Sequence, residues 1–247
     1  MPTLNLPGGA RVARAIVFDK DGVLVDFDRY WGALTRQRLE AMAADLDPAE
    51  ELELLALLGY PGHVDPDGPL PMATRFESMA VATGFLYRRG LPWVEARDRV
   101  RSAFAVAETR LPADALRQCG GAAETLAELR ARHWRIGVAT TDTAAHAWHT
   151  LEALGLAPWI DALVGGDEVE RGKPDPQMFD LVCSRLGVAP AEAAMVGDGI
   201  NDLKLVRAAG GAGAIGVLGG VSRREVLAPE ADVVLEQLSD LLALCSA

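Results

Sequence analysis

The sequence predicts an α/β fold in which a helical segment interrupts a parallel sheet. From about residue 122 onward, short apolar runs alternate with segments whose apolar residues recur at helical spacing. An earlier apolar run, Ala15–Phe18, is followed by a long stretch of helical pattern. Half of the 247 residues are hydrophobic, which is enough for a sizeable core. Short strands joined by helices form parallel sheets with both faces covered. We therefore expect a three-layer, Rossmann-like core at residues 1–25 and 121–247, with an inserted all-helical domain at residues 26–120.

The first expected strand, Ala15–Phe18, ends at a turn that contains Gly22. In the segment that follows, four stretches carry apolar residues at helical spacing. These predicted helices are Arg29–Ala44, Glu50–Leu58, Met72–Arg88 and Pro92–Arg110. Residues 59–69 are rich in glycine and proline, and we expect a loop there between the two helical pairs.

The second half of the chain alternates between the two types of element. The predicted helices are Ala122–His133, Thr143–Leu154, Asp175–Leu186 and Ile200–Ala209. The predicted strands are Arg135–Ala139, Ala162–Val164, Ala193–Val196 and Ala214–Leu218. In open parallel sheets, ligands bind beyond the carboxyl ends of the strands. The reactive residues are therefore expected at those ends.

The composition argues against several classes of protein. A net charge of −11 disfavours binding to a nucleic-acid backbone, which needs a basic surface. No stretch approaches ~18 uninterrupted apolar residues, so no membrane span is expected, and residues 1–9 lack the pattern of a signal peptide. The scattered cysteines Cys119, Cys183 and Cys245 favour neither a disulfide framework nor a zinc site. The expected location is a reducing cytoplasm.

Two carboxylates follow the first predicted strand directly. Asp19 and Asp21 are two residues apart, so in extended backbone both side chains project to the same side. Such a pair can divide the work of a reaction, because one carboxylate can attack while the other moves protons.

Three further strand ends or loops carry polar residues. Thr140 and Thr141 precede a predicted helix, where a hydroxyl and free backbone N–H groups make an anion site. Lys173 precedes a proline that is expected to start a helix, and it could neutralise phosphate oxygens. Asp198 and Asp202 are four residues apart at a helix start and share one face. With Asp19, these two supply oxygen ligands suited to Mg²⁺.

Each of these residues also has a structural explanation when taken alone. Asp142 or Asp198 could cap a helix, and Lys173 could be a solvated surface residue. However, the four segments carry Asp/Asp, Thr, Lys and Asp/Asp in that order. One shared site explains this set better than four unrelated roles.

The ordered set resembles the haloacid dehalogenase-like hydrolase superfamily, whose members are mostly Mg²⁺-dependent phosphatases. The four motifs match residues 19–24, Thr140, residues 173–174 and residues 197–202. The resemblance covers nearly the whole chain, and residues 26–120 take the place of the family's helical cap of the C1 type. Residues 18–22 and the length of the cap look like those of phosphoglycolate phosphatases.

The resemblance implies roles for individual residues. Asp19 would be the nucleophile that forms an aspartyl-phosphate, and Asp21 the acid and base. Thr140 and Lys173 would hold the transferring phosphoryl group. Thr141 is a further candidate for phosphate binding, although it stands where relatives often have asparagine.

The resemblance also implies a metal cofactor and a class of substrate. The expected cofactor is Mg²⁺, with Asp19, Asp21, Asp198 and Asp202 as its candidate ligands. The expected partner is a small phosphorylated metabolite, such as phosphoglycolate, and neither nucleic acid nor a membrane. Candidate anion clamps in the helical domain are Arg29, Arg75, Arg88 and Arg89.

Two other functions are compatible with parts of this pattern. A phosphosugar mutase similar to β-phosphoglucomutase would use the same core residues. A phosphorylated switch like a bacterial receiver domain also collects Asp, Thr and Lys at strand ends. Against the switch, the chain is long, the acceptor lies on the first strand, and Asp21 would hasten loss of the phosphate.

Overall fold

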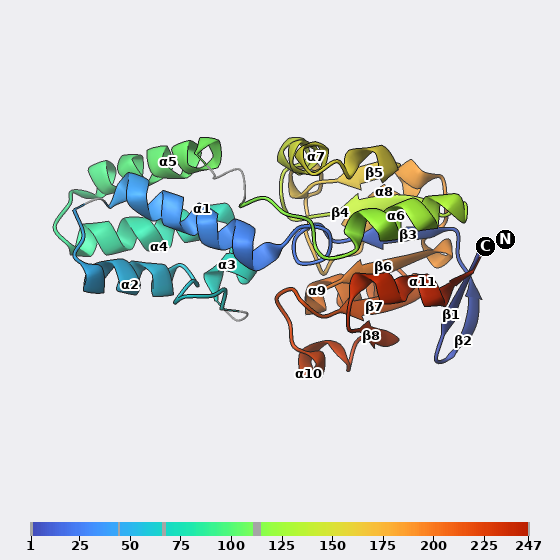
Figure 1. Ribbon diagram of the computed structural model, residues 1–247. Helices are drawn as coiled ribbons and strands as arrows, with labels where there is room; N and C mark the ends of the chain where they lie inside the picture. Colours follow the sequence, from blue (N-terminus) through green and yellow to red (C-terminus); the bar gives the residue numbers. More distant parts are fainter. Residues whose placement is uncertain (1, 44, 66–67, 111–114, 247) are drawn as a thin grey trace. The chain divides into compact units, whose positions relative to one another are not determined.

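The chain forms an α/β unit and an all-helical unit (Figure 1). The computed structural model describes residues 2–43, 45–65, 68–110 and 115–246. The α/β unit comprises residues 1–26 and 118–247, and the helical unit comprises residues 27–117. These limits lie close to the predicted domain limits. That the units act as a catalytic core and a cap stays a prediction.

A six-stranded parallel sheet forms the centre of the α/β unit, with the strand order β5-β4-β3-β6-β7-β8. Its strands are β3 (Ala15–Phe18), β4 (Arg135–Ala139), β5 (Ala162–Val164), β6 (Ala193–Gly197), β7 (Gly213–Val217) and β8 (Val233–Leu235). Every residue of β3, β6 and β7 is buried. Because both faces of these strands are covered, their sequences are continuous apolar runs. The predicted fold class is confirmed, and β3 pairs with β4 on one side and β6 on the other.

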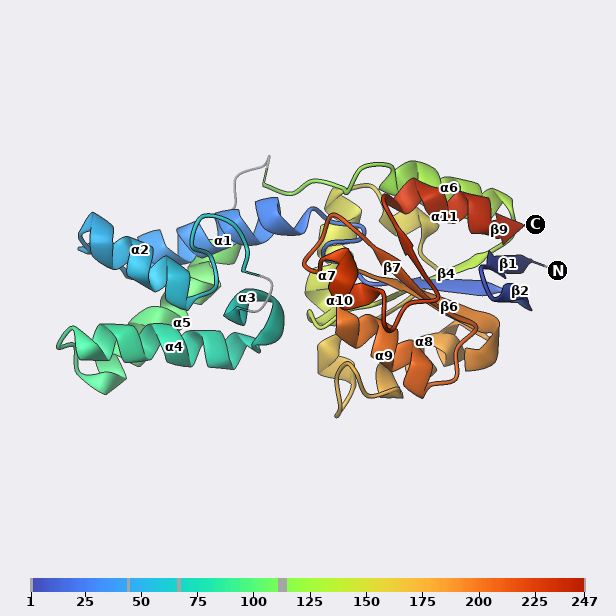
Figure 2. The ribbon, with the colours of Figure 1, turned by 90° about the horizontal axis from the view of Figure 1, so that it is seen from below.

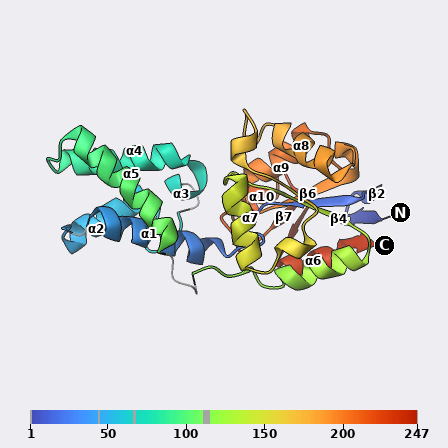
Figure 3. The ribbon, with the colours of Figure 1, turned by 90° about the horizontal axis from the view of Figure 1, so that it is seen from above.

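Helices cover both faces of this sheet. Figures 2 and 3 show α8 and α9 on one face and α6 and α11 on the other. The helices are α6 (Ala122–Ala131), α7 (Ala144–Ala153), α8 (Gln177–Leu186), α9 (Ile200–Ala208), α10 (Arg224–Leu227) and α11 (Leu241–Leu244). Short 3-10 turns are η1 (Ala157–Trp159), η2 (Gly166–Glu168), η3 (Pro190–Glu192) and η4 (Leu238–Asp240). On α8, buried Met178, Phe179 and Val182 recur at helical spacing and belong to the same core as Val17 and Met195.

A second, antiparallel sheet has the order β2-β1-β9 and is absent from the sequence-based prediction. Its strands are β1 (Thr3–Leu6), β2 (Gly9–Val12) and β9 (Cys245–Ser246). Leu4 and Leu6 of β1 are buried, and Leu4 lies opposite Cys245. This pairing joins the two ends of the chain, so no local pattern indicates it. The prediction also omits β8, α10 and α11, which are only three or four residues long.

The helical unit contains the four helices that the sequence predicts. They are α1 (Phe27–Met42), α2 (Pro48–Leu57), α4 (Arg75–Arg88) and α5 (Trp93–Thr109), with a single turn at α3 (Pro69–Met72). Leu54, Leu86 and Phe104 are fully buried in a core of this unit. Residue 44 and residues 66–67, which the prediction assigns to a helix and a loop, lie outside the described residues. No helix formed by the described residues combines the length and apolar character that crossing a bilayer requires.

Two helices begin two or more residues later than predicted, each for a local reason. Thr74 caps α4 and forms a capping box with Glu77, so α4 begins at Arg75 and Met72 belongs to α3. Helix α8 begins at Gln177, because the Asp175 carboxylate accepts a hydrogen bond of 3.0 Å from the Gln177 backbone N–H. The expectation that Pro174 starts this helix is therefore wrong, and Lys173 is carried on a loop.

We predict that Phe179→Ala lowers the free energy of unfolding of the α/β unit by about 3–5 kcal/mol, because it opens a cavity at a fully buried site. Urea denaturation monitored by tryptophan fluorescence would measure the change. The control is Val226→Ala on α10, where the side chain is 45% exposed and a change within about 0.5 kcal/mol is expected. Equal losses in the two variants would contradict this description of the core.

Candidate active site

The parallel register brings several predicted site residues to one edge of the sheet. Asp19 directly follows β3, and its backbone N–H donates a 2.9 Å hydrogen bond to the carbonyl of Val196 in β6. Thr140 directly follows β4, and its N–H donates to the carbonyl of Val164 at 3.0 Å. Asp198 follows β6. Because neighbouring parallel strands end at the same edge, these side chains start from adjacent positions.

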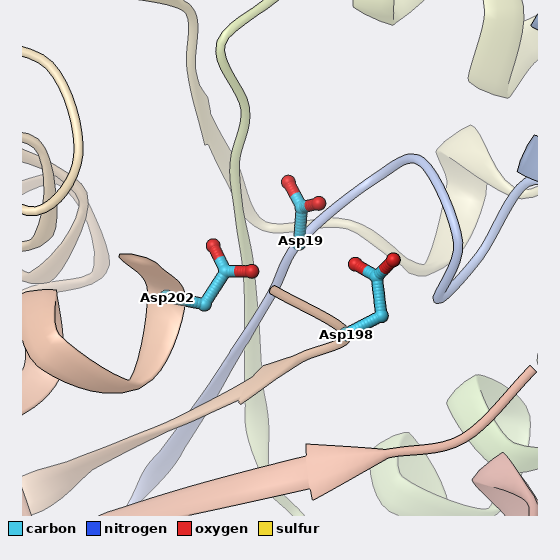
Figure 4. Close-up of side chains that lie close together, drawn as sticks. All are labelled: Asp19, Asp198 and Asp202. Atoms are coloured by element: carbon cyan, nitrogen blue, oxygen red, sulfur yellow. The ribbon is translucent and has the colours of Figure 1, made fainter. Parts of the chain in front are cut away.

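Three carboxylates converge at this edge. Asp19, Asp198 and Asp202 each place one oxygen within 4.8 Å of the other two (Figure 4). Asp198 and Asp202 are only 3% exposed. Asp202 lies in the first turn of α9, and its Oδ2 accepts a 3.2 Å hydrogen bond from the Gly199 N–H. Three negative charges so close together, two of them buried, require nearby positive charge.

Lys173 supplies part of that charge. Its Nζ lies 2.7 Å from Asp19 Oδ1 and 2.5 Å from Asp202 Oδ1. Burial alone would lower the pKa of this lysine, but the two carboxylates outweigh it and raise the pKa, so the ammonium stays charged. Both contacts are short, so one ammonium neutralises two carboxylates at once.

The electrostatics of the cluster fit a divalent cation. Burial and the charges of Asp19 and Asp202 raise the pKa of Asp198 well above its usual range. Burial also raises the pKa of Asp202 to about 6, although Lys173 opposes the shift. All donor atoms are carboxylate oxygens, which are the ligands that Mg²⁺ prefers. The donor set therefore suits the ion that the family implies.

Glycines make room for the acidic side chains. A Cβ at Gly220 would lie 2.1 Å from Asp198 Oδ2, and one at Gly22 would lie 2.2 Å from the same atom. Gly22 also has a φ of +83°, which few other residues adopt. Beside Gly220, the N–H of Val221 donates a 2.7 Å hydrogen bond to Asp198 Oδ2. The sequence analysis did not assign residues 220–221 to the site, although the Gly219-Gly220 pair marks a tight loop there.

Asp21 lies near this cluster in sequence but has a different partner. Its residue exposure is 8%, and its Oδ1 lies 2.8 Å from the ammonium of Lys20. The group of carboxylates close enough to share one ion consists of Asp19, Asp198 and Asp202. The role of Asp21 as a metal ligand therefore stays a prediction.

The start of α7 differs from the predicted anion site. Thr140 is 1% exposed, and its Oγ1 accepts a hydrogen bond from the Asp142 N–H at 3.2 Å. Asp142 Oδ1, Asp167 Oδ1 and Thr143 Oγ1 accept from the N–H groups of residues 143, 144 and 146. These backbone donors are therefore occupied, and the prediction of free N–H groups is wrong for them. The roles of Thr140 and Thr141 in phosphate binding stay predictions.

Two of the candidate anion clamps are ion-paired within the helical unit. Arg88 lies 2.6 Å from a Glu53 oxygen, and Arg89 lies 2.9 Å from a Glu50 oxygen. The Arg88 side chain is 63% exposed. These contacts connect α4 with α2, so they favour a structural role for both arginines.

The comparison with protein families agrees with this geometry. Residues 13–210 match the model of the haloacid dehalogenase-like hydrolases. The chain belongs to this family. It is 30% identical to a phosphoglycolate phosphatase of Salmonella typhi over 237 residues, which cover 93% of this chain and 91% of the relative. A phosphoglycolate phosphatase of Shigella boydii is 28% identical with the same coverage. The expected hydrolase family and its phosphatase relatives are confirmed.

Solved structures of other proteins share the fold. A putative β-phosphoglucomutase from Thermotoga maritima superposes with a TM-score of 0.68 at 22% identity, covering 93% of this chain and 97% of the other. A predicted phosphoglycolate phosphatase from Haemophilus somnus gives a TM-score of 0.68 at 19% identity, covering 94% and 97%. Because proteins with both names share this fold, the fold does not select between the two activities.

We predict that Asp198→Asn stabilises the hydrolase in the absence of Mg²⁺ and abolishes its stabilisation by Mg²⁺. The amide keeps an acceptor for the Val221 N–H and removes a buried like charge. For the wild-type protein, Mg²⁺ at ~100 times its Kd should raise the Tm by about 5–10 °C. Thermal unfolding with Mg²⁺ and with EDTA would measure both effects.

The extra stability of Asp198→Asn in the absence of Mg²⁺ should depend on the pH. A carboxyl group with a raised folded-state pKa binds its proton more tightly in the folded protein, so its ionisation destabilises the fold as the pH rises. Asp202 beside it has a pKa of about 6. Because the pKa of Asp198 is also raised, the stability advantage of Asp198→Asn without metal should grow as the pH rises above the ordinary range of an aspartate and shrink toward pH 4. A variant that still responds to Mg²⁺ as the wild type does would contradict the assignment.

Proposed function

We propose that this hydrolase is a Mg²⁺-dependent phosphatase of a small phosphomonoester, such as phosphoglycolate, and that it works through an aspartyl-phosphate at Asp19. The observation that carries the proposal is the cluster of Asp19, Asp198 and Asp202 with the Lys173 ammonium in contact with two of them. This cluster offers a nucleophile, ligands for a hard cation and a fixed positive charge for phosphate oxygens. The similarity to phosphoglycolate phosphatases over 93% of the chain supports the substrate class.

Asp19 is well placed to attack. Its side chain is 15% exposed, whereas that of Asp202 is 5% exposed, so Asp19 is the more accessible of the two carboxylates that contact Lys173. Lys173 holds Oδ1 of Asp19, which leaves Oδ2 for the reaction. In-line attack forms a bond between this oxygen and phosphorus while the bond from phosphorus to the leaving oxygen breaks.

The other acidic residues prepare the site for a dianionic substrate. Bound Mg²⁺ lowers the repulsion between a carboxylate and a phosphomonoester dianion. Asp19, Asp198 and Asp202 would hold the ion. The N–H of Val221 fixes the orientation of Asp198, and the N–H of Gly199 fixes that of Asp202. These contacts place the ligands before the substrate binds.

Asp21 serves as the acid and base in this proposal. In the first step its proton goes to the leaving alkoxide, and in the second step its carboxylate takes a proton from the water that attacks the aspartyl-phosphate. The Asp21 side chain is 10% exposed and follows Asp19 by two residues at the end of β3. Lys173 and Thr140 would hold the transferring phosphoryl group, with Thr141 as a further phosphate-binding candidate.

We assign substrate selection to the helical unit, residues 27–117. This unit has its own core and carries eleven arginines but no lysine. Arginine binds carboxylate and phosphate groups through two parallel hydrogen bonds, which suits a small anionic substrate. The candidates to substitute are Arg29, Arg75, Arg88 and Arg89, of which Arg88 contacts Glu53 and Arg89 contacts Glu50.

We predict that the purified protein releases phosphate from members of a phosphomonoester panel, including phosphoglycolate, only when Mg²⁺ is present. Asp19→Asn should reduce the release to the level of the enzyme-free control, because an amide cannot form the acyl phosphate. Asp21→Asn should lower kcat by about 10²–10⁴-fold, the usual size of a general acid–base contribution. A malachite-green assay of phosphate measures each rate.

Two outcomes would contradict this proposal. Phosphate release by Asp19→Asn at the wild-type rate would exclude Asp19 as the nucleophile. Interconversion of sugar phosphates without net phosphate release would identify a phosphosugar mutase instead, since the same core residues serve that reaction.

A further inference from the structure

One buried cation at the site has no role in the proposed reaction. The chain contains only three lysines, Lys20, Lys173 and Lys204. Lys173 contacts the carboxylate cluster, and Lys204 is exposed on α9. Lys20 lies between Asp19 and Asp21 in the sequence, and its side chain is fully buried. Since burying a lysine costs several kcal/mol unless it is paired, its partners indicate what it does.

Lys20 connects the loops that follow two neighbouring strands. Its Nζ lies 2.8 Å from Asp21 Oδ1, beyond β3, and 3.3 Å from Asp142 Oδ2, beyond β4. Two carboxylates therefore flank this ammonium and offset the cost of its burial. We call this arrangement of Asp21, Lys20 and Asp142 the lysine bridge.

Asp142 is itself held firmly on the far side of the bridge. Its Oδ2 lies 2.5 Å from Nδ1 of His146 on α7, and its Oδ1 accepts a 2.8 Å hydrogen bond from the Thr143 N–H. Its own N–H donates to Thr140 Oγ1 at 3.2 Å. The lysine bridge therefore connects Asp21 to a hydrogen-bonded turn that also carries Thr140.

We propose that Lys20 is a positioning residue that fixes the Asp21 carboxyl group for proton transfer, with Asp142 as its anchor. This inference rests on the proposed function. Lys20 occupies Oδ1 of Asp21 and leaves Oδ2 for the leaving oxygen. When the bond between phosphorus and that oxygen breaks, its electron pair stays on the oxygen, which takes the proton from Asp21 Oδ2. The ammonium stabilises the carboxylate that this transfer leaves behind.

The leaving group provides a specific signature for this role. A strongly basic alkoxide needs a proton as it departs, so its release depends on a well-placed acid. A p-nitrophenolate is a weak base and departs without that help. Loss of the lysine bridge should therefore slow an alkyl phosphate more than p-nitrophenyl phosphate. A residue with a purely structural role would slow both substrates equally.

The experiment compares Lys20→Met, Asp142→Asn and the double variant with wild type on phosphoglycolate, or on the best alkyl phosphate of the panel, and on p-nitrophenyl phosphate. Lys20→Met should lower kcat about 10–100-fold on the alkyl ester and less than about 3-fold on the aryl ester, with KM changed less than about 3-fold on both. Asp142→Asn should show the same pattern with a smaller loss. The matched control Lys204→Met, at an exposed site, should match wild type on both esters.

The double variant keeps the test informative if Lys20→Met does not fold. It removes the charge of Asp142, which in Lys20→Met loses its lysine partner but keeps its contacts with His146 and the Thr143 N–H. Circular dichroism reports whether the double variant folds. A folded double variant with the same selective loss supports the positioning role. A folded double variant with wild-type kcat on the alkyl ester, or with equal losses on both esters, would overturn the positioning role of Lys20. A wild-type protein that releases no phosphate from any ester would instead refute the proposed function.

Discussion

Repulsion among buried carboxylates is the constraint on which this site depends. The strands of the parallel sheet end at one edge, so the acidic residues that follow the neighbouring strands β3 and β6 lie close together. Asp19, Asp198 and Asp202 place oxygens within 4.8 Å, and burial leaves little water to screen them. Lys173 offsets part of this charge. The hard divalent cation that we propose for this site would offset the remainder.

The two buried lysines divide the acidic residues into two sets. Lys173 contacts the set that surrounds the candidate ion site, whereas Lys20 contacts Asp21 and Asp142 beside it. In the proposed mechanism Asp19 and Asp21 need different surroundings, because the nucleophile attacks as a carboxylate and the acid must exchange a proton. The two aspartates have different partners, because Lys173 contacts Asp19 and Lys20 contacts Asp21. The cost is the burial of several carboxylates that repel one another.

Much of this arrangement could be predicted from the sequence, because the reasons for it are local. Continuous apolar runs mark buried parallel strands, and Asp19 and Asp198 follow such runs directly. What could not be predicted depends on contacts between distant segments. The pairing of Leu4 with Cys245 and the contact of Lys20 with Asp142 join parts of the chain that no sequence window contains together. Helix starts are missed where one side chain, as at the beginning of α8, satisfies the first backbone donors.

The most direct test of the account is a crystal structure of the protein with Mg²⁺ and beryllium fluoride, which mimics a phosphoryl group on a carboxylate. The account predicts a beryllium bonded to Asp19 and one Mg²⁺ at about 2.0–2.1 Å from carboxylate oxygens of the cluster. Lys173 should contact the fluorides. A cation bound elsewhere, or beryllium bonded to a residue other than Asp19, would contradict the claim that the buried cluster serves to bring a metal ion and a nucleophile to one phosphoryl group.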